Sequence, residues 1–426
     1  MNRSRSGVAL LCGVVAATAV ACGTGGTSGS GSNGTLQTGP GVNASAKTIN
    51  LGVLTPLSGP AAIIGKYLAA GQADYFKNLD ATGGVSGWQV NLTTLDNKYP
   101  DAQTQVQDYN QIINNVLFLA QSLGSPTTQA IEQLAENAHV LIGTAAQDSA
   151  FVTHDINAVI GTPYAVDMAN AMYYVSQHMS GAKVGLIYQN DAYGQDGLKG
   201  YTAGMQAFGL TSVQQATYAA TDTSFASQVL AMKSAGATVV ALTAIPTAAA
   251  TIIGTGATLG YHPQWILQAP AWSEFLMTST GVASGAPTPV EPALVGAWVL
   301  GYEAQWGDTS VPGMSQFLSV QQKYSPMQVP DGYYMYGYCL AEVEQQIIAK
   351  ALGNNDLTRN GILQAKLNLG HVSFGGLLPD LTYSASLGPA DRQTGIYQVD
   401  LSTPGFLKQI QPYFESSAAM SMTFGS

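Results

Sequence analysis

Apolar and polar positions follow two different periods along the chain from residue 47 onward. Short apolar stretches, such as TINLGVLTP (48–56) and KVGLIYQND (183–191), predict buried strands. Residues 65–84 and 100–115 place apolar side chains at helical spacing, and Gly83 and Gly84 end the first of these helices. Strand–helix–strand units in series predict a parallel sheet with helices on both faces. The series occurs twice, over residues 48–146 and 167–270, so we expect two similar α/β lobes.

The rest of the chain adds two helices and a strand-like tail. Residues 313–325 and 336–353 have amphipathic helical patterns, and residues 394–410 have the pattern of a strand. Cys339 lies within the second helix, where the pattern favours a small core residue over a nucleophile.

The first 46 residues differ in composition from the rest. Arg3 and Arg5 precede the apolar run of residues 7–22, which is short for a membrane-spanning helix and predicts an export signal over residues 1–21. The run ends in Ala-Val-Ala-Cys, which resembles the lipobox of bacterial lipoproteins and implies that Cys22 carries a lipid. Cleavage after an A-x-A-like site, followed by free secretion, is the alternative. Residues 22–46 are rich in Gly, Ser and Thr and predict a flexible tether.

Composition narrows the classes of function. Only 9% of the residues are charged, and the net charge of −10 argues against nucleic-acid binding, which needs a basic surface. An apolar content of 46% over 426 residues is enough for two cores. If Cys22 carries a lipid, Cys339 is the one thiol left in the mature chain, so we expect no internal disulfide.

Motifs for catalysis and for cofactors are missing from the sequence. It contains no G-x-S-x-G, C-x-x-C or H-E-x-x-H motif, and its five histidines are dispersed. The stretch TPLSGPAAIIGKYLAAG (55–71) is close to a phosphate-binding loop. Five residues separate Gly59 from Gly65, however, and Tyr67 follows Lys66, so the spacing of that loop is not met. We therefore expect no enzymatic activity, no bound cofactor and no metal site.

Four stretches in order resemble one family. They are residues 51–103, with a strand, a Ser-Gly-Pro turn, a helix and Gly-Gly, then SLGSPTTQA (122–130), residues 184–209 and residues 221–242. Over residues 47–405 the chain resembles the substrate-binding proteins of branched-chain amino acid ABC transporters, which are type I periplasmic binding proteins. The resemblance implies two Rossmann-like lobes with parallel sheets, joined by a three-crossing hinge near residues 166, 301 and 390. Lobe 1 would comprise residues 47–166 and 302–390, and lobe 2 residues 167–301 and 391–415.

The resemblance also implies a ligand site between the lobes, at the carboxyl ends of strands, where parallel sheets generally bind ligands. Hydroxyls and helix N–H groups would receive a carboxylate there, although a plain N-cap is the structural alternative. The residues concerned are Ser125, Thr127 and Thr128. Ala146 and Gln147 fall where the family offers backbone groups and a hydroxyl to the head of an amino acid, with Asp148 or Ser149 in place of its Thr. Tyr193 would close over the ligand from lobe 2, with packing as the alternative role, and Ile64 would line the pocket for its side chain.

Two departures from the family concern the ligand's charge and a disulfide. Amino acid binders of this family place an acid after the strand that is QWILQAP (264–270) here, but Pro270, Ala271 and Trp272 stand at these positions. Glu274 would serve only if the loop shifts, and Trp272 would instead offer its ring face. This points to a ligand without an α-ammonium, such as an organic acid, an amide, urea or an aromatic compound. Gly124 also stands where the family has one cysteine of a disulfide.

These features predict an extracytoplasmic solute-binding protein, anchored to the membrane by a lipid. It would capture a small polar ligand, an amino acid or a related acid or amide, and deliver it to an ABC permease. A ligand-sensing regulator with the same fold is the alternative. The export signal and the tether favour transport, because a cytoplasmic regulator needs neither. A secreted hydrolase is disfavoured because no combination of nucleophile and base occurs.

Overall fold

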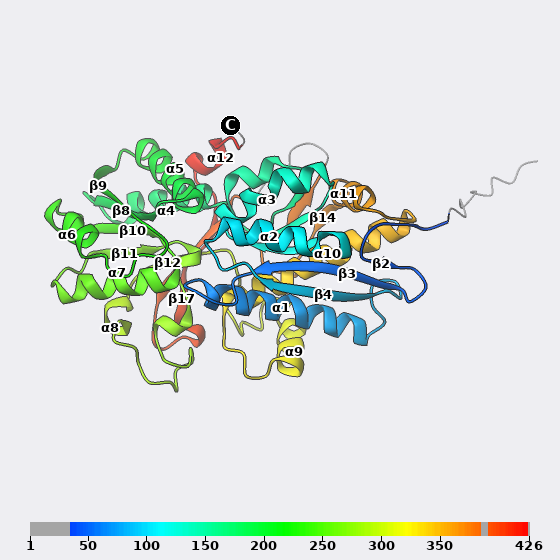
Figure 1. Cartoon of the computed structure of the whole chain (residues 1–426). Coiled ribbons are helices and arrows are strands. Elements are labelled where there is room, and N and C mark those ends of the chain that lie inside the picture. Colours follow the sequence, from blue (N-terminus) through cyan, green and yellow to red (C-terminus); the bar gives the residue numbers. More distant parts are fainter. Residues whose placement is uncertain (1–34, 385–390, 425–426) are drawn as a thin grey trace, which may run out of the picture. The chain divides into compact units, whose positions relative to one another are not determined.

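Two mainly parallel β-sheets organise the chain, as the doubled strand–helix series predicts (Figure 1). This computed structural model describes residues 35–384 and 391–424. The predicted export signal, Cys22 and the tether up to residue 34 lie outside the described residues. Residues from Leu36 onward form a single compact unit that contains both sheets. Each sheet, with the helices that pack on it, forms one lobe.

Lobe 1 is built on the sheet with the strand order β2-β3-β5-β6-β7. A sixth strand, β4, lies outside this order and also pairs with β3. Strands β3 to β7 are parallel, and β2 runs antiparallel to β3. Its elements are β2 (Val42–Asn43), β3 (Thr48–Thr55), α1 (Ala62–Ala81), β4 (Gln89–Asp96), α2 (Ala102–Ile112), β5 (Leu119–Leu123), α3 (Ser125–Asn137), β6 (Ile142–Ala145) and β7 (Asn157–Ala158). Later elements complete it: α9 (Met314–Tyr324), α10 (Gly332–Gly353), α11 (Arg359–Leu367), β14 (Gly370–Val372) and β15 (Leu381–Tyr383).

Lobe 2 is built on a seven-stranded sheet with the order β17-β16-β12-β11-β10-β8-β9. Its first five strands along the chain are parallel, and the last two are antiparallel additions at one edge. Its elements are α4 (Tyr164–His178), β8 (Lys183–Gln189), α5 (Ala192–Ala207), β9 (Thr211–Tyr218), α6 (Ala226–Ser234), β10 (Val239–Thr243), α7 (Pro246–Thr258), β11 (Gln264–Leu267), α8 (Glu291–Leu294), β12 (Trp298–Gly301), β16 (Thr394–Val399), β17 (Leu407–Phe414) and α12 (Ser417–Ser421). The central strands β8 and β10 are buried almost throughout, because helices cover both faces.

The chain passes between the lobes three times. It leaves lobe 1 after β7 and enters α4, which packs on α5 and β16 of lobe 2. It returns between β12 and α9, and the last connection joins β15 to β16. The fold is thus the two-lobed, three-crossing α/β architecture that the resemblance implies.

The predicted tether extends too far into the chain. Gln37 and Thr38 form β1, which pairs with β13 (Asp356–Leu357), and β2 pairs with β3, so residues 36–46 belong to the folded unit. The glycines of this segment are fitted closely. A Cβ on Gly41 would lie 2.6 Å from the Leu117 backbone nitrogen, and the φ of Gly41 is +78°. Composition alone could not distinguish this close approach from flexibility.

Close packing of α1 against α10 holds lobe 1 together. The two helices touch at glycines: a Cβ on Gly71 would lie 2.0 Å from the Tyr334 carbonyl oxygen, and a Cβ on Gly337 1.9 Å from that of Leu68. Two helix backbones can approach this closely only where neither carries a side chain. The same helix α10 supplies part of the ligand cavity described below, so this packing also positions the site.

We expect Gly337→Ala to lower the free energy of unfolding by about 1–3 kcal/mol, because the added methyl group must push the two helices apart. Urea unfolding followed by circular dichroism measures this difference. Gly353→Ala is the matched control at the end of the same helix, where an added Cβ meets no atom within 4 Å. An equal loss of stability in both variants would contradict the helix-contact explanation.

Candidate functional site

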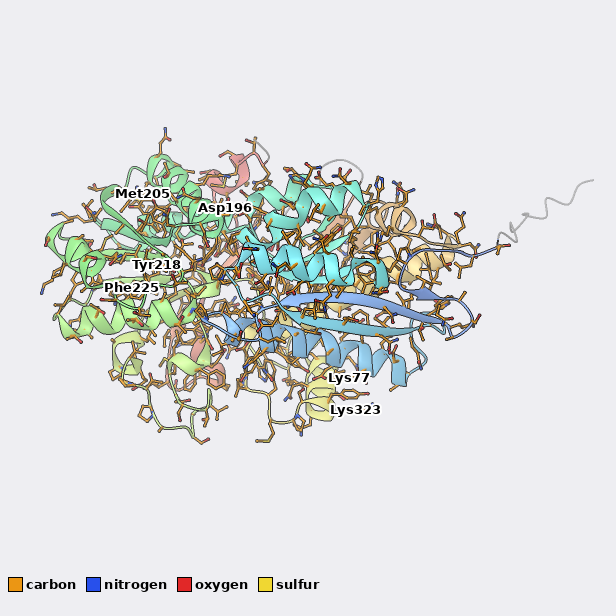
Figure 2. The ribbon with its side chains drawn as sticks, viewed as in Figure 1. Lys77, Asp196, Met205, Tyr218, Phe225 and Lys323 are labelled. Atoms are coloured by element: carbon orange, nitrogen blue, oxygen red, sulfur yellow. The ribbon has the colours of Figure 1, made fainter. Side chains whose placement is uncertain are left out.

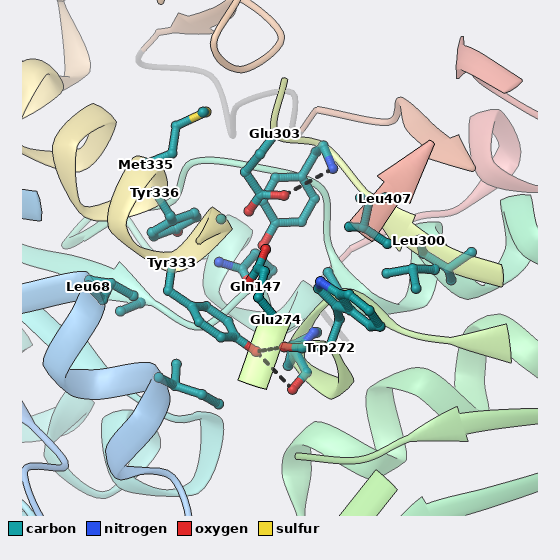
Figure 3. A pocket seen from close by; sticks show the side chains of 18 of the residues that line it. Leu68, Gln147, Trp272, Glu274, Leu300, Glu303, Tyr333, Met335, Tyr336 and Leu407 are labelled. Atoms are coloured by element: carbon teal, nitrogen blue, oxygen red, sulfur yellow. Dashed lines mark hydrogen bonds between the residues drawn. The ribbon is translucent and has the colours of Figure 1, made fainter. Parts of the chain in front are cut away.

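A cavity lies between the carboxyl ends of the two sheets. Its lining includes residues that follow β5 and β6 in lobe 1 and residues that follow β8, β10, β11 and β12 in lobe 2. The cavity volume is about 120 Å³, comparable with cavities that hold a benzene-sized molecule. Figure 3 shows this cavity from close by, with α10 on one side and the strands of lobe 2 on the other.

Aromatic and aliphatic side chains form most of the cavity wall. The aromatic residues are Tyr99, Tyr164, Tyr193, Trp272, Tyr302, Trp306, Tyr333, Tyr336 and Tyr397, and the aliphatic ones include Ile64, Leu68, Leu123, Ile245, Leu300, Met335 and Leu407. Glu274 and Glu303 are the two charged residues of the described lining, which contains no Lys, Arg or His. The wall thus offers a large apolar surface and few polar groups.

Five of the residues predicted from the sequence line this cavity: Ile64, Ser125, Gln147, Tyr193 and Trp272. Ile64 lies in the first turns of α1 and is 7% exposed. Tyr193 donates its hydroxyl proton to the Ala244 carbonyl at 3.1 Å, and its ring packs edge-on against Tyr164. Their roles in binding a ligand remain predictions.

The other three predicted residues are buried but are absent from the cavity wall. The Thr127 hydroxyl donates back to the Leu123 carbonyl at 2.5 Å, and the Thr128 hydroxyl lies 2.8 Å from the Ser122 hydroxyl. Ala146 is 1% exposed and does not line the cavity. Hydrogen bonds to the end of β5, which precedes α3, thus occupy both threonine hydroxyls.

The N-terminus of α3 opens onto the cavity through Gly124 and Ser125. Gly124 has a φ of +100°, and a Cβ there would lie 2.4 Å from the Tyr99 ring, so no cysteine fits at this position. The Ser125 hydroxyl faces Asp148, whose pKa it lowers, and makes no well-formed hydrogen bond. Free N–H groups and this hydroxyl together suit a carboxylate or a carbonyl oxygen.

Two acidic side chains reach the cavity, although the family resemblance placed Pro270, Ala271 and Trp272 where the family has its acid. Glu274 is 4% exposed and lines the cavity from lobe 2, so the loop does bring an acid to the site. Burial raises its pKa well above the ordinary value, and nearby Asp331 raises it further. Burial also raises the pKa of Glu303 to about 8. Burial therefore favours the protonated, neutral form of both carboxyl groups in the cavity.

Hydrogen bonds join the lobes around the cavity. The Tyr99 hydroxyl of lobe 1 donates to Asp191 of lobe 2 at 3.2 Å. On another side, the Ser149 backbone nitrogen donates to Asp196 at 3.0 Å, and Ser149 Oγ donates to the same carboxylate. Asp196 belongs to α5 and lies where lobe 2 meets lobe 1 (Figure 2). Ser149, expected as a ligand contact, is thus occupied in holding the lobes together.

The sequence analysis did not identify several residues of the cavity wall. Tyr333, Met335 and Tyr336 come from the first turn of α10, and Glu303 from the second crossing. Their segment DGYYMYGY (331–338) is rich in tyrosine, which is unusual for a purely buried helix face and was an available signal. Two of its hydroxyls bind carbonyls of distant segments. Tyr336 donates to Thr144 at 2.9 Å, and Tyr333 to Trp272 at 2.6 Å.

Comparisons with known proteins agree with this geometry. A family model described as periplasmic binding protein matches residues 48–404. A Leu/Ile/Val-binding protein homologue of Brucella abortus is 25% identical over 72% of this chain and 78% of its own length. The structure of a fatty acid ABC transporter substrate-binding protein from Thermomonospora curvata is 28% identical and has a TM-score of 0.84, covering 92% of this chain and 97% of that one. A branched-chain amino acid ABC transporter protein from Thermus thermophilus with bound valine has a TM-score of 0.76 at 15% identity, over 87% and 97% of the two chains.

The fold and the cavity between sheet ends define a two-lobed solute-binding protein. The chain belongs to the periplasmic binding protein family, and it is similar to substrate-binding proteins of branched-chain amino acid ABC transporters. This is a family of extracytoplasmic solute-binding proteins and not a class of enzymes. No helix in the described part of the chain is both long enough and apolar enough to span a membrane. Nor do residues 35–384 and 391–424 contain a cluster of three potential metal ligands.

Glu303 should make the stability of the protein depend on pH. Its pKa of about 8 in the folded state lies above the ordinary 4.5, so the folded state keeps a proton that the unfolded state releases. This contribution to the free energy of unfolding therefore falls as the pH rises from about 4.5 to about 8, by up to about 1.4 kcal/mol per pH unit. We expect Glu303→Gln to remove this part of the slope, as measured by urea unfolding at pH 5.5, 6.5 and 7.5.

Asp308→Asn is the control for the Glu303 experiment. Asp308 is exposed in the same segment, and a hydrogen bond from Ser310 lowers its pKa below the ordinary value. The control should therefore leave the slope above pH 5 unchanged. A Glu303→Gln variant with the wild-type slope would show that Glu303 is ionised in the folded protein at neutral pH.

Proposed function

We propose that the protein captures a small organic acid or amide with an apolar body between its lobes and delivers it to an ABC permease. The observation that carries this proposal is the cavity itself. Its wall is mainly aromatic and aliphatic, and the N-terminus of α3, which no side chain caps, forms part of it. The acid or amide head would sit at Ser125 and the N–H groups of α3. The apolar body would pack on Ile64, Tyr193 and Trp272.

The electrostatics of the wall favour a ligand without an ammonium group. An ammonium placed in the cavity would lose its water, and the burial that raises the pKa values of Glu274 and Glu303 also opposes their ionisation as its counter-ions. A carboxylate or an amide oxygen would find hydrogen-bond donors at α3 instead. The similar protein from Thermomonospora curvata, a fatty acid ABC transporter substrate-binding protein, supports the same class of ligand.

We further propose that Cys22 carries a lipid that anchors the folded lobes outside the membrane, as the Ala-Val-Ala-Cys sequence suggests. The ligand would be held by hydrogen bonds and apolar contacts and released unchanged, with no covalent step. Permease and ATPase genes next to the gene for this protein would support delivery to a transporter. A neighbouring regulatory partner in their place would favour the ligand-sensing alternative.

A thermal-shift panel tests the ligand class. We expect 4-methylpentanoic acid and its amide to stabilise the protein more than L-leucine, which differs from the acid only by the ammonium group. At a hundred times its dissociation constant, a ligand adds about 2.7 kcal/mol to the free energy of unfolding. Native mass spectrometry of the purified protein identifies any ligand carried from the cell, and octanoic acid extends the panel to longer chains. A larger shift with leucine than with its deaminated counterpart would overturn the proposed ligand class.

Ser125→Ala should weaken binding of the ligand found in this panel by about tenfold, because a hydrogen bond to the head is lost. Thr127→Val is the matched control. It removes a hydroxyl two residues further along the same helix, but that hydroxyl is bonded to Leu123 and does not line the cavity. Isothermal titration calorimetry measures both affinities. Equal affinities in the two variants would remove Ser125 from the site.

A further inference from the structure

Side chains of lobe 1 contact the part of the cavity wall that belongs to lobe 2. Residues 270–276 follow β11 of lobe 2 and face the first turn of α10 in lobe 1. The Tyr333 hydroxyl donates to the carbonyl oxygens of Pro270 at 3.2 Å and Trp272 at 2.6 Å, as Figure 3 shows. The rings of Tyr67 in α1 and Phe275 lie 5.7 Å apart, centroid to centroid. The position of Trp272 in the cavity therefore depends on lobe 1.

A pair of buried carboxyl groups spans the same contact. Asp331 caps α10, and its Oδ1 accepts from the backbone nitrogens of Tyr333 at 2.7 Å and Tyr334 at 3.4 Å. Its Oδ2 is buried and accepts no N–H or hydroxyl from the described residues. Glu274 of lobe 2 is 4% exposed, and the charge of Asp331 acts on its carboxyl group. Burial raises the pKa of Asp331 to about 7 and that of Glu274 well above its ordinary value.

Among the residues that the structure describes, no positively charged group is found to act on the pair. The titratable groups that act on it are the phenols of Tyr67 and Tyr333 and the carboxyl of Glu303, and none of them is basic. Ionising both Glu274 and Asp331 in this desolvated place would set two negative charges against each other. The contact between the lobes is therefore complete only while the pair holds a proton.

We infer that Asp331 and Tyr333 are positioning residues for the Trp272–Glu274 wall, and that closing the lobes takes up the proton that Glu274 and Asp331 share. The inference rests on the proposed function in one respect, namely that the lobes separate to admit a ligand. Separation places each carboxyl in water, where its pKa returns to about 4. The closed state then binds one more proton than the open state. The ratio of closed to open molecules should therefore fall by up to tenfold per pH unit between about pH 4.5 and pH 7.

Infrared spectroscopy of the full chain without added ligand tests the shared proton directly. At pH 7 the wild-type protein should show the carbonyl stretch of a protonated carboxylic acid that is absent from the Glu274→Gln variant. Glu342→Gln serves as a control for a second buried acid of α10. Its pKa is also raised by burial, to about 7, but Asp331 and Glu274 are not among the groups that act on it. A Glu274→Gln spectrum identical to that of the wild type would overturn the inference.

The distance between the lobes tests the coupling to closure. Spin labels at the exposed positions Gln133 in α3 and Ser234 in α6 report this distance in the ligand-free protein. The closed fraction should fall as the pH rises from 5 to 7.5 in the wild type and in Glu342→Gln. It should fall less steeply in the double variant Glu274→Gln with Asp331→Asn, whose amides carry no titratable proton. The other buried acids at the contact, Asp148, Asp196 and Glu303, keep their share of the slope. Tyr333→Phe should lower the closed fraction at every pH and leave its slope unchanged.

A closed fraction that does not depend on pH in the wild type would contradict the inference, as would a wild-type slope in the double variant. Circular dichroism confirms that each variant is folded. Because no ligand is added, failure here is distinct from failure of the proposed ligand class. The lobes could bind an acid or amide without proton uptake. Equally, proton uptake by Glu274 and Asp331 could accompany closure around a different ligand.

Discussion

The carboxyl ends of the parallel strands in both lobes face one another, and the rest of the site follows from this constraint. In a parallel sheet every loop that follows a strand emerges at the same edge. Leu123 and Ala145 end their strands in lobe 1, and Thr243, Leu267 and Gly301 end theirs in lobe 2. The residues that follow these strand ends therefore line one cavity. The three crossings connect the lobes while these two edges face the cavity.

The protein has few charges, and several of its acids lie at the contact between the lobes. Asp191 accepts from Tyr99, Asp196 accepts from Ser149, and Glu274 is paired with Asp331. Each contact joins lobe 1 to lobe 2 through a buried oxygen that water would otherwise solvate. Closure therefore replaces water at a small number of polar groups while apolar and aromatic walls come together. Such a balance would keep closure reversible, as the proposed capture and release of a ligand requires.

Glycine illustrates how one residue type can indicate opposite structures. The Gly-rich segment before residue 46 suggested a flexible tether, yet Gly41 adopts a positive φ against the backbone of lobe 1. Gly71 and Gly337 allow two helix backbones to touch at the centre of that lobe. In each case the absence of a side chain matters because of what lies opposite, and that neighbour is far away in the sequence. Local composition cannot tell this tight packing from freedom of movement.

The sequence alone determined the two α/β lobes, the parallel strands and the position of the site at their carboxyl ends, because hydrophobic periodicity is local and connection rules are strict. It also pointed to Ile64, Ser125, Gln147, Tyr193 and Trp272, which follow strands or begin helices. Only the tertiary structure decided that the hydroxyls of Thr127 and Thr128 bond to the end of β5, and that Glu274 reaches the cavity. It alone brought Glu303, Asp331 and Tyr333 to the same place. Their partners are residues distant in sequence, so burial and charge at these positions arise only when the lobes pack together.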